Sequence, residues 1–89
     1  MHEPDVHRFV LLRDGAELGF TEYRRRENEF RFIHTVIDPE IQERGLGTLL
    51  VTGALDWVRA NSTDRVSASC PFVTAFLVRH PEYSDLTER

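Results

Sequence analysis

Apolar and polar residues alternate along the first part of the chain with the two-residue period of β-strands. The segment 8–13 is rich in Phe, Val and Leu, and it ends at Asp14 and Gly15, a pair typical of tight hairpin turns. A second strand is predicted over 17–23, before a polar stretch that contains Asn28. We expect these two strands to pair as an antiparallel hairpin.

The segment 30–37 has the clearest strand pattern in the chain. The two-residue period predicts that one face of this strand carries Phe30, Phe32, His34 and Val36. The opposite face would then carry Arg31, Ile33, Thr35 and Ile37. Asp38 and Pro39 end the strand, because proline has no N–H to donate to a ladder.

Between residues 45 and 60 the apolar period becomes that of a helix. The apolar arc of this predicted helix consists of Leu46, Leu49, Leu50, Gly53, Ala54, Trp57 and Val58. A short strand over 65–69 and a second helix from Pro71 to about His80 follow. A strand–helix–strand unit normally places its two strands parallel. The sequence therefore predicts a mixed α+β fold, with a mostly antiparallel sheet, one parallel unit and two main helices in a single domain over 1–89.

Composition excludes several classes of protein. At 89 residues the chain is long enough for one small domain. Its formal net charge of -4 argues against nucleic-acid binding, although the basic run Arg24–Arg26 either is solvated or meets a phosphate. The single cysteine, Cys70, suggests a reducing compartment, and no stretch is apolar enough to span a membrane. We expect a cytoplasmic protein that binds no membrane.

The segment 42–47, Gln-Glu-Arg-Gly-Leu-Gly, joins the end of a strand to the start of a helix. The first turn of a helix leaves backbone N–H groups unpaired, and with the helix dipole they favour an anion. Gly45 and Gly47 remove side chains that would keep a phosphate away, and Arg44 adds positive charge. Neither a Walker A loop nor a dinucleotide fingerprint fits, since no Gly-Lys-Ser/Thr occurs and position 50 is Leu. A glycine-rich helix start without a ligand is the alternative.

The pattern Gln-x-x-Gly-x-Gly after a strand resembles the pyrophosphate-binding motif of the GNAT acetyltransferase superfamily, which holds coenzyme A. The segments 70–73 (Cys-Pro-Phe-Val) and 79–83 (Arg-His-Pro-Glu-Tyr) are similar to small single-domain members, and the likeness covers nearly the whole chain. It implies that the strands before the loop and after the helix splay apart, with the pantetheine arm between them. Two helices and a closing strand pair of typical members have no counterpart in the pattern, so we expect an open acceptor side.

The resemblance also assigns residues to acetyl-CoA, the cosubstrate that it implies. Val36 and Ile37 would pair with pantetheine, and Phe76 and Arg79 would border the far side of the cofactor. The pyrophosphate would be held by Gln42, Arg44, Gly45, Leu46, Gly47 and Thr48. The acceptor would be an amine on a small molecule or a protein, and the chain would be a monomer or a weak homodimer.

Acetyl transfer to an amine requires a base for the amine, a donor for the oxyanion and a proton for the departing thiolate. Cys70, at a helix N-terminus, would accept the acetyl group as a thiolate or protonate the leaving group as a thiol, unless it is an inert core cysteine. His34 is a candidate general base or a core histidine. Tyr83 is a less favoured general acid, and His80 borders the cofactor or caps a helix. The N–H of Val36 is a candidate oxyanion donor.

No spacing of histidines around Cys70 indicates a metal site. A thiol hydrolase built on Cys70 and His34 would leave the segment 42–47 unexplained. The sequence therefore predicts an acetyl-CoA-dependent N-acetyltransferase that acts on an exposed amine. The alternatives are a sensor or partner module that binds acyl-CoA without turnover, and an interaction domain without a ligand.

Overall fold

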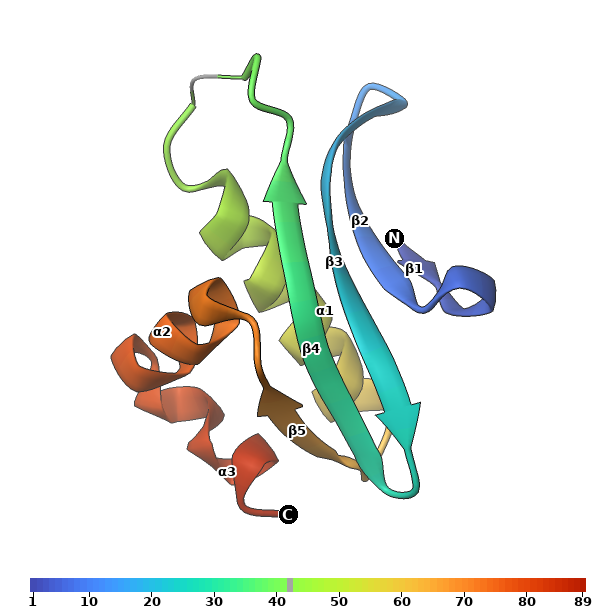
Figure 1. The fold of residues 1–89 in the computed structure, drawn as a ribbon, viewed down its shortest axis with the longest axis vertical. Coiled ribbons are helices and arrows are strands. Elements are labelled where there is room, and N and C mark those ends of the chain that lie inside the picture. The colour runs from blue at the N-terminus through green and yellow to red at the C-terminus, as the bar shows by residue number, and fades with distance from the viewer. Residues whose placement is uncertain (42) are drawn as a thin grey trace.

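The computed structural model describes residues 1–41 and 43–89. Five strands form one sheet in chain order, namely β1 (His2–Glu3), β2 (Arg8–Arg13), β3 (Ala16–Arg26), β4 (Glu29–Ile37) and β5 (Arg65–Ala68). The strands from β1 to β4 pair antiparallel, and β5 lies parallel to β4 (Figure 1). The mixed α+β fold with one parallel unit is confirmed.

Both predicted hairpin turns form. Asp14 and Gly15 have φ values of 51° and 81°, so both adopt the left-handed conformation that closes a tight turn between β2 and β3. Asn28, with a φ of 63°, turns β3 into β4. The polar stretch from Arg24 therefore belongs largely to β3, which is longer than the pattern suggested because its outer half faces solvent.

A β-bulge between β3 and β4 overturns the predicted faces of the clearest strand. Glu22 pairs with His34 while Tyr23 pairs with Phe32, so Ile33 is the extra residue. Beyond the bulge the alternation is inverted, since one additional residue moves every later side chain to the other face. Thr35 and Ile37 therefore join Phe30 and Phe32 on the buried face, and His34 and Val36 lie on the opposite face.

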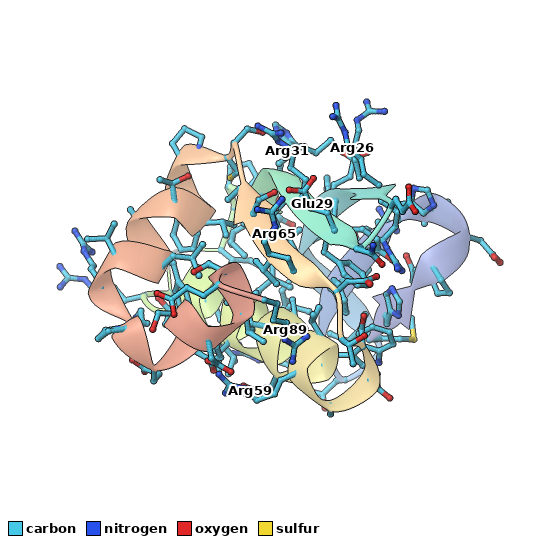
Figure 2. The ribbon with its side chains drawn as sticks, turned by 90° about the horizontal axis from the view of Figure 1, so that it is seen from below. Arg26, Glu29, Arg31, Arg59, Arg65 and Arg89 are labelled. Atoms are coloured by element: carbon cyan, nitrogen blue, oxygen red, sulfur yellow. The ribbon has the colours of Figure 1, made fainter. Side chains whose placement is uncertain are left out.

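Helix α1 (Leu46–Asn61) packs against one face of the sheet, and α2 (Pro71–Arg79) and α3 (Ser84–Thr87) lie beside β5 (Figure 1). Short 3₁₀ turns cover Pro4–Val6 and Pro81–Tyr83. Arg26 and Arg31 project from the face away from α1 (Figure 2). The core between α1 and the sheet consists mainly of Phe9, Tyr23, Phe30, Phe32, Leu50, Val51, Ala54, Leu55, Val58 and Val66.

Candidate functional site

Helix α1 begins with backbone amides that the described residues leave unpaired. Its N-cap, Gly45, has a φ of 83°, a conformation that residues with a Cβ rarely adopt. Leu49 N–H donates to the Gly45 carbonyl over 2.9 Å, which is the first bond of the helix. No described side chain caps the first turn, and the turn contains no acidic residue. The amides of Leu46, Gly47 and Thr48 are therefore available to an anion.

A hollow of about 300 Å³ lies between the start of α1 and one side of α2, from Phe72 to Arg79. The structure brings together Thr48, Phe76 and Arg79 in its wall, three of the residues assigned to the cofactor. Arg44 is exposed in the preceding loop, and Gln42 lies outside the described residues. His80 also lines the hollow, where its ring stacks on Phe76 with the centroids 4.1 Å apart. Aromatic surface beside a cationic side chain suits a ligand that carries phosphate.

Phe72 borders the same turn more closely than the sequence indicated. A Cβ placed on Gly47 would lie only 2.6 Å from the tip of the Phe72 ring. The ring is 42% exposed, so it can swing away. Gly47 therefore has a packing role that requires no ligand, and a bulky substitution there cannot by itself distinguish a phosphate site from a simple helix contact.

The strands β4 and β5 diverge halfway along β4, as expected from the resemblance. Their pairing ends at Phe32 and Ala68, and the amides of Ser69 and Cys70 both donate to the Phe32 carbonyl, over 3.0 and 3.2 Å. The chain then turns into α2, while β4 continues to Ile37 (Figure 1). Among the described residues, the second half of β4 therefore has no strand paired with it on its β5 side, and we call the space beside this unpaired edge the slot.

The backbone groups that face this slot belong to Thr35 and Ile37. Asp38 N–H donates to the Leu18 carbonyl over 2.8 Å, which fixes the pairs that exchange hydrogen bonds between β3 and β4. Such pairs alternate along an antiparallel ladder, so Phe20 and Val36 form the next hydrogen-bonded pair after Leu18 and Asp38. The N–H and carbonyl of Val36 therefore point toward β3, and those of Thr35 and Ile37 point to the other side. The expectation that the Val36 N–H faces the slot is therefore wrong, and the amides that point to this side of β4 are those of Thr35 and Ile37.

The Cys70 side chain lies at the closed end of the slot. Cys70 is the N-cap of α2 and is 5% exposed. Its thiol donates to the Thr35 hydroxyl over 3.5 Å, and that hydroxyl is 2.9 Å from the hydroxyl of the fully buried Thr21. The sequence pattern missed Thr35, because the two-residue period placed it on the wrong face. A buried thiol at the end of a slot lined by backbone amides can act on a slender ligand that enters the slot.

His34 does not meet Cys70. Its side chain is exposed on the face opposite Thr35, where the nearest aromatic ring is that of Phe20, 6.4 Å away between centroids. Successive residues of a strand point to opposite faces, and Cys70 contacts the face of Thr35. His34 is therefore neither a core histidine nor part of a Cys–His pair, which removes the geometric basis of a thiol hydrolase.

Tyr83 is bonded away from the slot. Its hydroxyl donates to Asp56 Oδ1 on α1 over 2.7 Å, and the Arg59 guanidinium lies over its ring. Burial, followed by the bond and the negative charge of Asp56, raises the pKa of Tyr83 to about 12. A phenol held in this way fastens the C-terminal turn to α1, and it is poorly placed to serve as a general acid.

The arginines of the basic run lie at the end of β3 that pairs with the start of β4, whereas the slot opens at the end of β4. The reading in which they meet the phosphate is therefore not supported.

Within residues 1–41 and 43–89, no group of three or more His, Cys, Asp or Glu side chains is arranged to hold a metal ion. None of the helices in that part of the chain has the length and apolarity that a membrane crossing requires.

Comparisons with known proteins agree with this geometry. The family model of the GCN5-related N-acetyl-transferases matches residues 8–86. A solved structure of a GCN5-like candidate N-acetyltransferase from Staphylococcus aureus is similar, with a TM-score of 0.69 and 26% sequence identity over 90% of this chain and 79% of that one. Among curated proteins, none matches the chain significantly.

Proposed function

The chain belongs to the GCN5-related N-acetyltransferase family, and on that premise we propose that it binds acetyl-CoA in the slot beside β4 and transfers the acetyl group to an exposed amine. The observation that carries this proposal is the coincidence of three features at one place. The unpaired amides of α1 suit a pyrophosphate, the slot suits a thiol-bearing arm, and Cys70 lies where that arm would end. The expected location remains the cytoplasm, and the expected acceptor remains a small molecule or a protein.

The pyrophosphate would lie against the amides of Leu46, Gly47 and Thr48, with Arg44 and Arg79 supplying charge. The pantetheine arm would pair with the main chain of Ile37 and Thr35. This assignment keeps Ile37 in its predicted role. Val36 no longer pairs with pantetheine, because its main-chain groups point toward β3 and its side chain lies on the far face of the sheet. Because no helix of the described residues covers that far face at β4, the acceptor would approach from an open side.

In the proposed reaction the free amine attacks the thioester carbonyl carbon, so that a C–N bond forms and the C–S bond breaks. The Thr35 amide, on the residue that contacts Cys70, would stabilise the oxyanion, and the Ile37 amide would remain paired with the pantetheine arm. The electron pair stays on the coenzyme A sulfur, which takes the Cys70 proton, and Cys70 regains a proton from water. The amine gives its own proton to solvent. We assign Cys70 as a proton donor because its thiol contacts a hydroxyl, Thr35, and no base among the described residues.

The same contact supports a second candidate, an acyl-CoA-binding module without turnover, since a thiol bonded to Thr35 has no activating base in the described residues. The test combines two readouts on the intact chain. We expect acetyl-CoA to raise the Tm, because it binds only the folded state. We also expect the protein to transfer acetyl groups from acetyl-CoA to amines in a mixture of polyamines and peptides. No rise in Tm at millimolar acetyl-CoA would end both readings. A rise without transfer would leave only the binding module.

Variants then separate the roles of Cys70. If Cys70 is the proton donor, Cys70→Ala should slow transfer and leave the acetyl-CoA-induced rise in Tm unchanged. His34→Ala should change neither the transfer rate nor the rise in Tm. Mass spectrometry after brief mixing with acetyl-CoA should show no acetyl group on Cys70. An acetyl group on Cys70 that passes to an added amine would replace the direct route by a two-step route through the thiol.

A further inference from the structure

The strand β5 has an unpaired edge. Among the described residues it is the last strand of the sheet, and β4 is its only partner. Arg65 N–H donates to the Asn28 carbonyl and Ser69 N–H to the Phe32 carbonyl, so alternate residues of β5 bond toward β4. The main-chain groups of Val66 and Ala68 therefore point outward, where the described residues offer them no backbone hydrogen bond. Such an edge can accept another strand.

A hollow of about 380 Å³ runs along this edge. Its sides are β5, α2 and α3, and its apolar surface includes Leu77 and Val78. Val78 is 79% exposed, the largest exposure among the large apolar residues of the described chain. The Ser67 hydroxyl, on β5 itself, is buried and has no partner among the described residues. An added strand would cover this apolar surface with one set of its alternating side chains.

The side chains on the opposite face of the added strand would lie on the side of the sheet that carries several arginines. Arg31, on β4, is in register with Ser67 of β5. Arg24, on β3, lies directly across from Arg31. Arg26 and Arg31 project from the same face of the sheet (Figure 2), and Arg65 shares this face because Glu29 is in register with both Arg26 and Arg65. Arg65 bonds to Glu29, whereas Arg24, Arg26 and Arg31 form no ion pair with a described carboxylate. Like charges opposite one another destabilise a sheet. Glu29 is the one carboxylate in register with these four arginines among the described residues, so this face keeps an excess of positive charge.

We propose that this groove docks an extended acidic peptide segment of a partner protein, added as a strand beside β5. Main-chain pairing with Val66 and Ala68 would supply register, apolar residues would cover Leu77 and Val78, and the alternating acidic residues would meet Arg31 and Arg65. A second copy of β5 fits less well, because it would bring another Arg65 to a basic face. The proposal stands apart from acetyl transfer, since the groove is on the far side of β5 from the slot.

The probe is a fluorescent synthetic peptide of alternating valine and glutamate, titrated into the intact chain. A valine–lysine peptide and an N-methylated valine–glutamate peptide are the ligand controls. We expect the acidic peptide to bind saturably and to slow hydrogen exchange of the Val66 and Ala68 amides, and we expect both controls to fail. Val78→Asp should weaken binding by about tenfold or more, and Val6→Asp, at a residue 57% exposed elsewhere, should not.

Four results would overturn the proposal. They are no saturable binding, equal binding of the N-methylated peptide, protection that misses Val66 and Ala68, and equal effects of the two aspartate variants. A concentration-dependent dimer that Val78→Asp abolishes would assign the groove to a second copy instead. Acetyl-CoA-induced stabilisation of the Val78→Asp variant, measured alongside, reports on the slot independently, so failure of one proposal does not imply failure of the other.

Discussion

Arg13 holds Glu43 by two hydrogen bonds, from Nη1 to Oε2 over 2.7 Å and from Nη2 to Oε1 over 3.0 Å. The pair joins the end of β2 to the loop that precedes α1. The hydrogen bond from Arg13 holds the pKa of Glu43 below its ordinary value. Both side chains are half exposed, so the pair contributes little to stability. The pair occupies both oxygens of Glu43, and no described side chain caps the first turn of α1.

From this pair we expect a measurable coupling to acetyl-CoA binding. Arg13→Ala releases a negative charge three residues before the helix, and it should weaken binding by about two- to fivefold. Glu43→Gln should bind at least as well as the wild type, and adding it to Arg13→Ala should restore affinity. Isothermal titration at low salt measures the cycle. Equal loss in Arg13→Ala with and without Glu43→Gln would show that the released carboxylate is irrelevant.

The contact between Phe72 and Gly47 gives a prediction about stability. Gly47→Ala gains about 1 kcal/mol of helix propensity, but the new Cβ displaces the Phe72 ring. We expect the two effects to nearly cancel in the unfolding free energy. In a Phe72→Ala background the clash is gone, and Gly47→Ala should then stabilise by about 1 kcal/mol. Urea titrations of the four proteins test this, and identical effects in both backgrounds would show that the ring yields freely.

Thr35 connects Cys70 to Thr21, and its hydroxyl should matter more than its size. Thr35→Val keeps the shape but leaves the Thr21 hydroxyl, which is fully buried, without its partner. We expect a loss of about 1–3 kcal/mol in unfolding free energy. Thr35→Ser keeps the hydroxyl and should lose less than half as much. Chemical denaturation measures both, and equal losses would indicate that the methyl group, not the hydroxyl, is what the site requires.

The two faces of β4 and the slot beside it show which features could be predicted from the sequence and which could not. The hairpin at Asp14-Gly15 and the helix from Leu46 follow from local chemistry, so pattern and turn signals predicted them. The bulge at Ile33 has no local signal, because it reflects how β4 fits β3 across a distance. That single residue decided which face carries Thr35 and His34. The Arg13–Glu43 pair likewise depends on the path of a loop, which no periodicity encodes.

Gly19 and Gly53 offer a matched pair of glycine substitutions. A Cβ on Gly19 would lie 2.5 Å from the Val36 carbonyl oxygen, a backbone atom that cannot move without disturbing the pairing of β3 and β4. We expect Gly19→Ala to destabilise by about 2 kcal/mol or more. A Cβ on Gly53, inside α1, would have no described atom outside the neighbouring helix backbone within 4 Å, so Gly53→Ala should stabilise by about 1 kcal/mol. Thermal unfolding of the two variants decides, and a tolerated Gly19→Ala would mean that the strands separate easily there.

The raised pKa of the Tyr83 hydroxyl should make the unfolding free energy depend on pH in the alkaline range. Its pKa is about 12 in the folded chain, against an ordinary value of 10.0, because of burial and then of Asp56. The folded state therefore keeps a proton that the unfolded state releases once the pH passes 10. Stability from this group is complete below pH 10 and is lost as the pH rises toward 12. Tyr83→Phe should flatten this part of the profile relative to the wild type. Tyr23, whose pKa is also raised by burial, supplies the comparison. If Tyr83→Phe leaves the alkaline slope unchanged while Tyr23→Phe removes it, the bond between Tyr83 and Asp56 does not persist in solution.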